Sequence, residues 1–150
     1  MAWFDPFESQ FVEVDGLRLF VRHSPLSDRH KPALLLLHGF PQTHAMWHRM
    51  AQGLRADFFI VMPDLRGYGH SMAPAAQPDH SNMSKRAMAH DAAAVMDHFG
   101  INEFHLCGHD RGARVAHRMA LDHSARIKRL CLMDIAPTLD MYNATDMAFA

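Results

Sequence analysis

The chain has 150 residues, of which 49% are apolar and 21% charged, a balance that indicates one folded domain rather than a disordered segment. Its net charge of -1 and its lack of a basic block exclude a nucleic-acid-binding role. No stretch is long and apolar enough to span a membrane, and residues 1–10 do not form an export signal, so we expect a soluble, cytoplasmic protein.

The first predicted elements are a hairpin and a buried strand. Residues 10–14 and 17–22 alternate in polarity and are joined by Asp15-Gly16, a dipeptide typical of tight hairpin turns. Residues 33–37 form a continuous apolar run, which is typical of a strand covered on both faces. This strand leads into His38-Gly39-Phe40-Pro41.

The middle of the chain is predicted to add two helices and a strand. We expect a helix over about residues 44–54, a buried strand over 58–62 and a loop over 63–69. Residues 72–79 contain two prolines and are expected to form a surface excursion. A helix is then predicted over residues 84–99, with Ser84 as its cap.

The last third repeats the strand and helix pattern. A strand is predicted over residues 104–107, a helix over 111–123 and a strand over 127–133, while 141–150 have helix-forming composition. Strands that alternate with helices after a hairpin predict an α/β fold with a mostly parallel sheet. Ligands bind such sheets at the carboxyl ends of the strands.

One turn in this region carries the functional prediction. Gly108-His109-Asp110-Arg111-Gly112 matches a nucleophile elbow with Asp in the place of the usual Ser. Gly108 and Gly112 are expected where a Cβ would collide with the neighbouring strand or helix. Carboxylate attack on an sp3 carbon gives an ester that water can cleave, so Asp110 suits displacement at carbon. The alternative is that Asp110 only caps the helix that follows.

The cysteines and histidines indicate no metal site. Cys107 and Cys131 fall in predicted buried strands, so we expect packed thiols rather than a disulfide. His44 and His48 have helical i,i+4 spacing but lack the Glu of a His-Glu-x-x-His zinc motif. We therefore expect both to lie on a solvated helix face.

These motifs resemble those of α/β-hydrolases with an Asp nucleophile, and among them most the haloacetate (fluoroacetate) dehalogenases. The resemblance runs from about Phe11 to the last residue. His38-Gly39-Phe40-Pro41 and Arg66-Gly67-Tyr68-Gly69 are similar to motifs of epoxide hydrolases and haloalkane dehalogenases as well. The segment from Gly108 to Arg114 is more specific, because those two families commonly place Trp where this chain has Arg111.

The resemblance implies a role for several residues. Asp110 is the implied nucleophile, and Arg111 and Arg114 bind the substrate carboxylate. Asp134 orients the catalytic His, and the backbone N–H groups of Phe40 and Arg111 form an oxyanion hole. The resemblance also implies a homodimer that needs no cofactor.

Family members are longer than this chain. Their catalytic His and the side chains that bind the departing halide lie in a lid and a C-terminal portion that this chain lacks. We therefore expect residues 1–150 to be the N-terminal portion of one α/β-hydrolase core domain, inactive without that His.

The two arginines suit an anionic substrate. A haloacetate approaching Asp110 at about 4 Å meets a repulsion of order 4 kcal/mol at an effective dielectric near 20. Arg111 and Arg114 stand at i and i+3 on one helical turn, and their planar groups can bind a carboxylate and favour ionised Asp110. Alternatively, Arg114 is a solvated helix residue, and Asp134 only forms hydrogen bonds in the turn at the end of its strand. Asp140 is a weaker candidate for the acid that orients the catalytic His.

The predicted activity is hydrolysis of fluoroacetate or chloroacetate to glycolate and halide through an ester on Asp110. An epoxide hydrolase with the same nucleophile is the nearest alternative. A binding module without catalysis, or an inactive fragment, is the alternative from another class.

Overall fold

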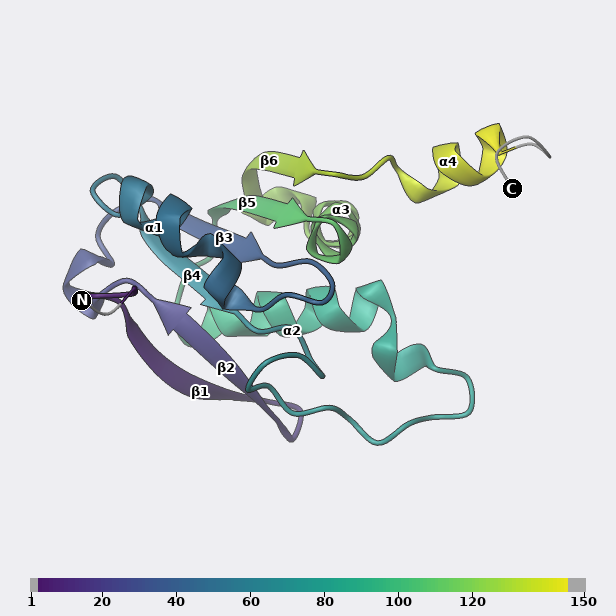
Figure 1. Cartoon of the computed structure of the whole chain (residues 1–150), viewed down its shortest axis with the longest axis horizontal. Helices are drawn as coiled ribbons and strands as arrows, with labels where there is room; N and C mark the ends of the chain where they lie inside the picture. Colours follow the sequence, from purple (N-terminus) through teal and green to yellow (C-terminus); the bar gives the residue numbers. More distant parts are fainter. Residues whose placement is uncertain (1–2, 146–150) are drawn as a thin grey trace.

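A six-stranded mixed sheet forms the centre of residues 3–145, the part of the chain that this computed structural model describes (Figure 1). The strands follow the spatial order β1-β2-β4-β3-β5-β6. They are β1 (Glu8–Val14), β2 (Leu17–His23), β3 (Ala33–Leu37), β4 (Phe59–Pro63), β5 (Phe104–His109) and β6 (Ile127–Met133). The helices are α1 (His48–Leu54), α2 (Lys85–His98), α3 (Arg111–Asp122) and α4 (Thr138–Ala144).

The first two strands form the predicted hairpin. β1 and β2 pair antiparallel, and Asp15 and Gly16 at the turn have φ values of 48° and 80°. Positive φ at both central residues is the conformation that Asp-Gly favours in tight hairpins. β2 also pairs antiparallel with β4, while β3, β4, β5 and β6 run parallel, which confirms the predicted mostly parallel sheet.

The central strands are buried on both faces. Along β3, Leu35 and Leu37 face one hydrophobic cluster and Leu34 and Leu36 face the other. This alternation explains why the strand reads as an unbroken apolar run, as predicted.

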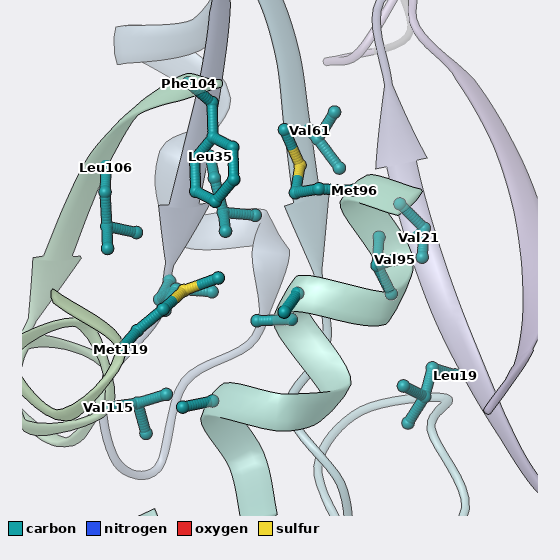
Figure 2. Packing of buried hydrophobic residues seen from close by; sticks show 14 of the residues in the cluster. Leu19, Val21, Leu35, Val61, Val95, Met96, Phe104, Leu106, Val115 and Met119 are labelled. Atoms are coloured by element: carbon teal, nitrogen blue, oxygen red, sulfur yellow. The ribbon is translucent and has the colours of Figure 1, made fainter. Parts of the chain in front are cut away.

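Helices cover both faces of the sheet. α2 and α3 pack on one face, where Val95, Met96, Val115 and Met119 meet side chains of the strands (Figure 2). α1 and the turn before it cover the other face with Trp47 and Ala51. The Ser84 hydroxyl accepts a 3.1 Å hydrogen bond from the Ala87 N–H and so caps α2, which confirms the predicted start of this helix.

Two predicted helices differ from those observed. The helix expected over residues 44–54 is divided into a 3-10 turn, His44–Trp47, and α1, because the Thr43 hydroxyl accepts from the Ala45 N–H at 3.3 Å and starts a tighter turn. The helix expected over 141–150 begins earlier, at Thr138, and ends at Ala144. Residues 146–150 lie outside the described part.

The strand β6 forms one edge of the sheet. Residues 128–131 of this strand are exposed, so the prediction that Cys131 packs in a core is wrong. Cys107 on β5 is buried as predicted, and both thiols are free. Within residues 3–145, no helix has the length and apolar character needed to cross a membrane.

Candidate active site

The candidate site lies at the carboxyl ends of β3, β5 and β6. The loop after β3 carries Phe40, the turn after β5 carries Asp110, and the end of β6 carries Asp134. The Asp110 N–H donates to the Met133 carbonyl at 3.0 Å, which ties the turn to the end of β6. The parallel strand order therefore brings together residues that are distant in the sequence.

Asp110 stands on a strained turn that glycines make possible. Its φ and ψ are 47° and -116°, a backbone conformation that residues other than glycine rarely adopt. A Cβ on Gly108 would overlap the backbone of Gly112, and a Cβ on Gly112 would overlap the Leu37 carbonyl on β3. Both collisions were predicted from the sequence, and the turn has the form of a nucleophile elbow.

One oxygen of the Asp110 carboxylate is bound by the loop after β3. The Phe40 N–H donates to Oδ2 at 2.8 Å, whereas the side chain makes no capping hydrogen bond to α3. Partial burial alone would raise the pKa of Asp110, but the amides of Phe40 and Arg111 and the charges of His109 and Arg111 lower it below its ordinary value. Asp110 therefore occupies the N-cap position of α3 as a partly exposed carboxylate, but its side chain does not cap the helix.

The approach of this loop to the elbow requires Gly39. A Cβ on Gly39 would lie 2.8 Å from the Asp110 Cβ and 2.8 Å from His109 Nδ1. Any side chain here would displace the Phe40 N–H from the carboxylate.

The two predicted anion-binding arginines lie on the first turn of α3. The Arg111 guanidinium carbon is 5.2 Å from the centre of the Phe40 ring. Arg114 Nη1 donates to the Thr138 hydroxyl at 3.0 Å. The two guanidinium groups therefore have different neighbours, Phe40 for Arg111 and Thr138 for Arg114, and of the two only the Arg111 charge acts on Asp110.

Sequence reasoning missed a third cation, Lys85, at the start of α2. Partial burial lowers the pKa of Lys85, the nearby positive charges of Arg111 and Arg114 lower it further, and Asp110 opposes them. The signal available in the sequence was only a Lys after a helix cap, which is common on helix surfaces.

Asp134 lies beside the elbow at the end of β6. Its side chain is 78% exposed, and Oδ2 is 3.6 Å from His109 Nε2. His109 Nδ1 is in turn 3.2 Å from Gln42 Oε1. Among residues 3–145, no group of three or more His, Cys, Asp or Glu side chains is arranged to hold a metal ion.

Comparison with known proteins identifies the family. Residues 32–149 match the alpha/beta hydrolase fold family. The chain belongs to the α/β-hydrolases. This confirms the fold class predicted from the sequence.

The relatives of this α/β-hydrolase include a fluoroacetate dehalogenase and epoxide hydrolases. It is 46% identical over 143 residues to the fluoroacetate dehalogenase of Burkholderia sp, covering 95% of this chain and 46% of that protein. It is 36% identical over 106 residues to a soluble epoxide hydrolase of Corynebacterium sp. (strain C12), covering 71% of this chain and 35% of the relative. The crystal structure of a protein from Nostoc sp PCC 7120 assigned to the α/β hydrolases superposes with a TM-score of 0.90 at 51% identity, covering 98% of this chain and 49% of that chain. The match thus covers about half the length of the Burkholderia and Nostoc proteins and about a third of the Corynebacterium enzyme.

Buried polar residues fix the loops of this α/β-hydrolase. His38 Nδ1 donates to the Gly39 carbonyl at 2.9 Å, while Nε2 accepts from the Leu65 N–H at 2.9 Å. Burial lowers the pKa of His38, so the neutral ring matches this donor and acceptor pair. His38 therefore has a structural role that joins the loops after β3 and β4.

Asp64 holds the loop after β4. It accepts from the His44 N–H and His44 Nδ1, both at 2.8 Å, and from the His70 N–H at 3.1 Å. The prediction that His44 lies on a solvated face is therefore wrong, because the buried Asp64 carboxylate draws the imidazole inward. A Cβ on Gly69, which has a φ of 54°, would overlap the Asp64 carboxylate.

Proposed function

We propose that the protein hydrolyses haloacetates, such as fluoroacetate or chloroacetate, to glycolate and halide through an ester on Asp110. The observation that supports this most is the placement of the Asp110 carboxylate. Oδ2 is held at 2.8 Å from the Phe40 N–H on an elbow that begins the helix of Arg111 and Arg114. The similarity to a fluoroacetate dehalogenase supports the substrate class.

In the first proposed step, the Asp110 oxygen not bound by Phe40 attacks the α-carbon of the substrate. A carbon–oxygen bond forms, the carbon–halogen bond breaks, and the halide leaves with the bonding electron pair. The lowered pKa of Asp110 keeps the attacking group ionised at neutral pH. The product of this step is a carboxymethyl ester of Asp110.

Positive charge is needed for an anionic substrate to reach this carboxylate. Arg111 and Arg114 offset the repulsion between the two negative groups, and a guanidinium can bind a carboxylate through two hydrogen bonds. Lys85 adds to the same positive field. A neutral substrate needs none of these charges.

In the second proposed step, water attacks the carbonyl carbon of the ester. The amides of Phe40 and Arg111 stabilise the oxyanion, and glycolate leaves with one Asp110 oxygen. The family resemblance assigns activation of this water to a His outside these 150 residues, oriented by Asp134. We therefore propose that residues 1–150 alone can form the ester but cannot complete turnover.

Mass spectrometry tests the nucleophile. The chain is incubated with chloroacetate and digested, and we expect a carboxymethyl group on Asp110 that hydroxylamine removes, as it removes esters. Adducts on cysteine are thioethers and resist hydroxylamine, so the two are distinguished. The control Asp110→Asn should lose only the labile adduct. Labelling confined to cysteine or histidine would contradict the covalent step, and a non-catalytic role would then be favoured.

An epoxide hydrolase is the second candidate, favoured by the similarity to the Corynebacterium enzyme. Arg114→Ala separates the two, because this change should slow esterification by chloroacetate by about tenfold or more while leaving the reaction with a neutral epoxide unchanged. The rates of adduct formation with both reagents provide the measurement. Equal loss with both reagents would argue against a carboxylate-binding role for Arg114.

A further inference from the structure

The side chain of Phe40 packs on Arg111. The guanidinium carbon lies 5.2 Å from the ring centre, within the range of a cation–π interaction. The Phe40 ring is also 60% exposed, so it packs little against the hydrophobic core. The position of the Phe40 ring is thus explained by its contact with the Arg111 guanidinium and not by burial in the core.

Other aromatic rings hold Phe40 in this position. Tyr68 meets the Phe40 ring edge-on, with ring centres 6.4 Å apart and an interplanar angle of 86°. His38 packs on Tyr68 at 5.2 Å, and its own ring is fixed by two backbone hydrogen bonds. The motifs around His38 and Tyr68 therefore form a support that reaches from the buried loops to Arg111.

We propose that the Phe40 side chain is a positioning residue that holds the Arg111 guanidinium beside Asp110 and so sets the affinity for substrates that carry a carboxylate. The backbone of the same residue binds the Asp110 carboxylate at 2.8 Å. One residue thus fixes both the nucleophile and one of its anion-binding groups. This inference rests on the proposed function.

The physical effect is a loss of side-chain freedom before the substrate arrives. An arginine on the first turn of a helix samples many rotamers, and ordering it on binding weakens the complex. Stacking on an aromatic ring restricts these rotamers in advance. For a partly exposed pair, removing the ring should weaken carboxylate binding by about two- to five-fold.

The experiment compares Phe40→Leu with Phe40→Tyr. Leucine keeps the backbone N–H and an apolar side chain but has no aromatic face, whereas tyrosine keeps that face. Phe11→Leu is a matched control, because Phe11 is also exposed and carries the Arg18 guanidinium at 4.3 Å on the far β1–β2 hairpin. NMR spectra of the backbone amides report whether each variant is folded.

Two measurements report the position of the Arg111 side chain and its effect on chloroacetate binding. The ring current of Phe40 should shift the Arg111 side-chain protons, and we expect this shift in the wild type and Phe40→Tyr but not in Phe40→Leu. The chloroacetate concentration for half-maximal ester formation should rise in Phe40→Leu by about two- to five-fold at an unchanged maximal rate, with Phe40→Tyr and Phe11→Leu near the wild type.

The outcomes separate this inference from the proposed function. If the wild type forms no ester on Asp110, the proposed function fails, and acetate binding followed by NMR then tests the positioning role alone. If the ester forms but Phe40→Leu retains the Arg111 shifts and the same concentration dependence, the positioning role is overturned while the proposed function stands. A fall in the maximal rate alone would also overturn it, because that result indicates damage to the oxyanion-binding loop.

Discussion

Two aspartates near the carboxyl edge of the sheet are ionised for different reasons. Asp64 is 1% exposed and is bound by one ring N–H and two backbone N–H groups. Asp110 is partly exposed, and its carboxylate is stabilised only by the backbone amides of Phe40 and Arg111 and by nearby positive charge. A buried carboxylate with both oxygens bound by N–H donors stabilises the fold, whereas a carboxylate with one oxygen free of hydrogen bonds can act as a nucleophile.

Asp64→Asn tests the structural role. Burial alone would raise the pKa of Asp64, but the hydrogen bonds from His44 and His70 lower it. A lowered folded pKa contributes stability that is present above the unfolded value of about 3.9 and is lost as pH falls through the folded value. We expect Asp64→Asn to reduce the free energy of unfolding by about 1–3 kcal/mol at neutral pH and to weaken its pH dependence below about pH 4.

Urea unfolding at neutral and acidic pH provides this measurement. Asp57→Asn is the control, because Asp57 is exposed, and it should change stability little. An equally steep loss of stability in acid for Asp64→Asn and the wild type would assign that loss to other groups.

At the level of single residues, the sequence predicted positions marked by a local motif but not contacts between residues distant in the chain. Asp110 was recognisable because two glycines and an adjacent strand mark the turn. The burial of His44 was not, because its partner Asp64 lies 20 residues away and contact between them depends on the tertiary fold. For the same reason the sequence did not reveal that Lys85 lies near Asp110 or that the Phe40 ring packs on Arg111.

At the level of elements, the contact of α3 with β3 places Asp110, the proposed nucleophile. Gly112 lies against the Leu37 and His38 carbonyls, so the first turn of the helix meets the end of the strand without a side chain between them. This close approach brings the elbow to the Phe40 N–H. The position of Asp110 therefore depends on a contact between backbones, which polarity patterns alone do not report.

The same substitution at two helical glycines should have opposite effects. Gly112→Ala should destabilise the fold by at least about 3 kcal/mol, because its Cβ overlaps backbone atoms that cannot move aside. Gly53→Ala on α1 should stabilise the protein by about 0.5–1 kcal/mol, because its Cβ has open space and alanine favours a helix. Thermal and urea unfolding of the two variants give the comparison, and a neutral Gly112→Ala would contradict the close packing of the elbow.

Element types were predicted better than element details. The hairpin, the buried strands, α2 and α3 follow from turn residues, apolar runs and capping that are local in the sequence. The division of the helix near residues 44–54 and the early start at Thr138 depend on local hydrogen bonding that hydrophobic spacing does not distinguish.

At the scale of the whole molecule, the sheet is well covered at its centre and open at β6. Cys107 and Cys131 are register partners on β5 and β6, yet one is buried and the other exposed. Burial and the adjacent Cys131 raise the pKa of the Cys107 thiol to about 12. Apolar composition predicted a buried strand over residues 127–133 but did not show that residues 128–131, Cys131 among them, are exposed.

The two thiols should therefore differ in reactivity. A disulfide reagent at mildly alkaline pH should modify Cys131 quickly and Cys107 only after unfolding, because the thiolate is the reactive form. Cys131→Ser should lose the fast phase. Fast modification of both thiols in the folded protein would show that the edge opens readily.

The assembly of the protein stays a prediction. The family resemblance implies a homodimer, and light scattering on the purified protein measures its mass in solution. A mass equal to that of one chain would contradict the dimer.

The hydrogen bond from Phe40 to a single carboxylate oxygen makes the two oxygens of Asp110 unequal. Under the proposed reaction, the oxygen kept against the Phe40 amide becomes the ester carbonyl and survives each cycle. Its neighbour departs as the new hydroxyl of glycolate, and an atom from solvent takes its place. In water enriched in heavy oxygen, the enzyme would thus exchange one carboxylate oxygen of Asp110 and retain the other.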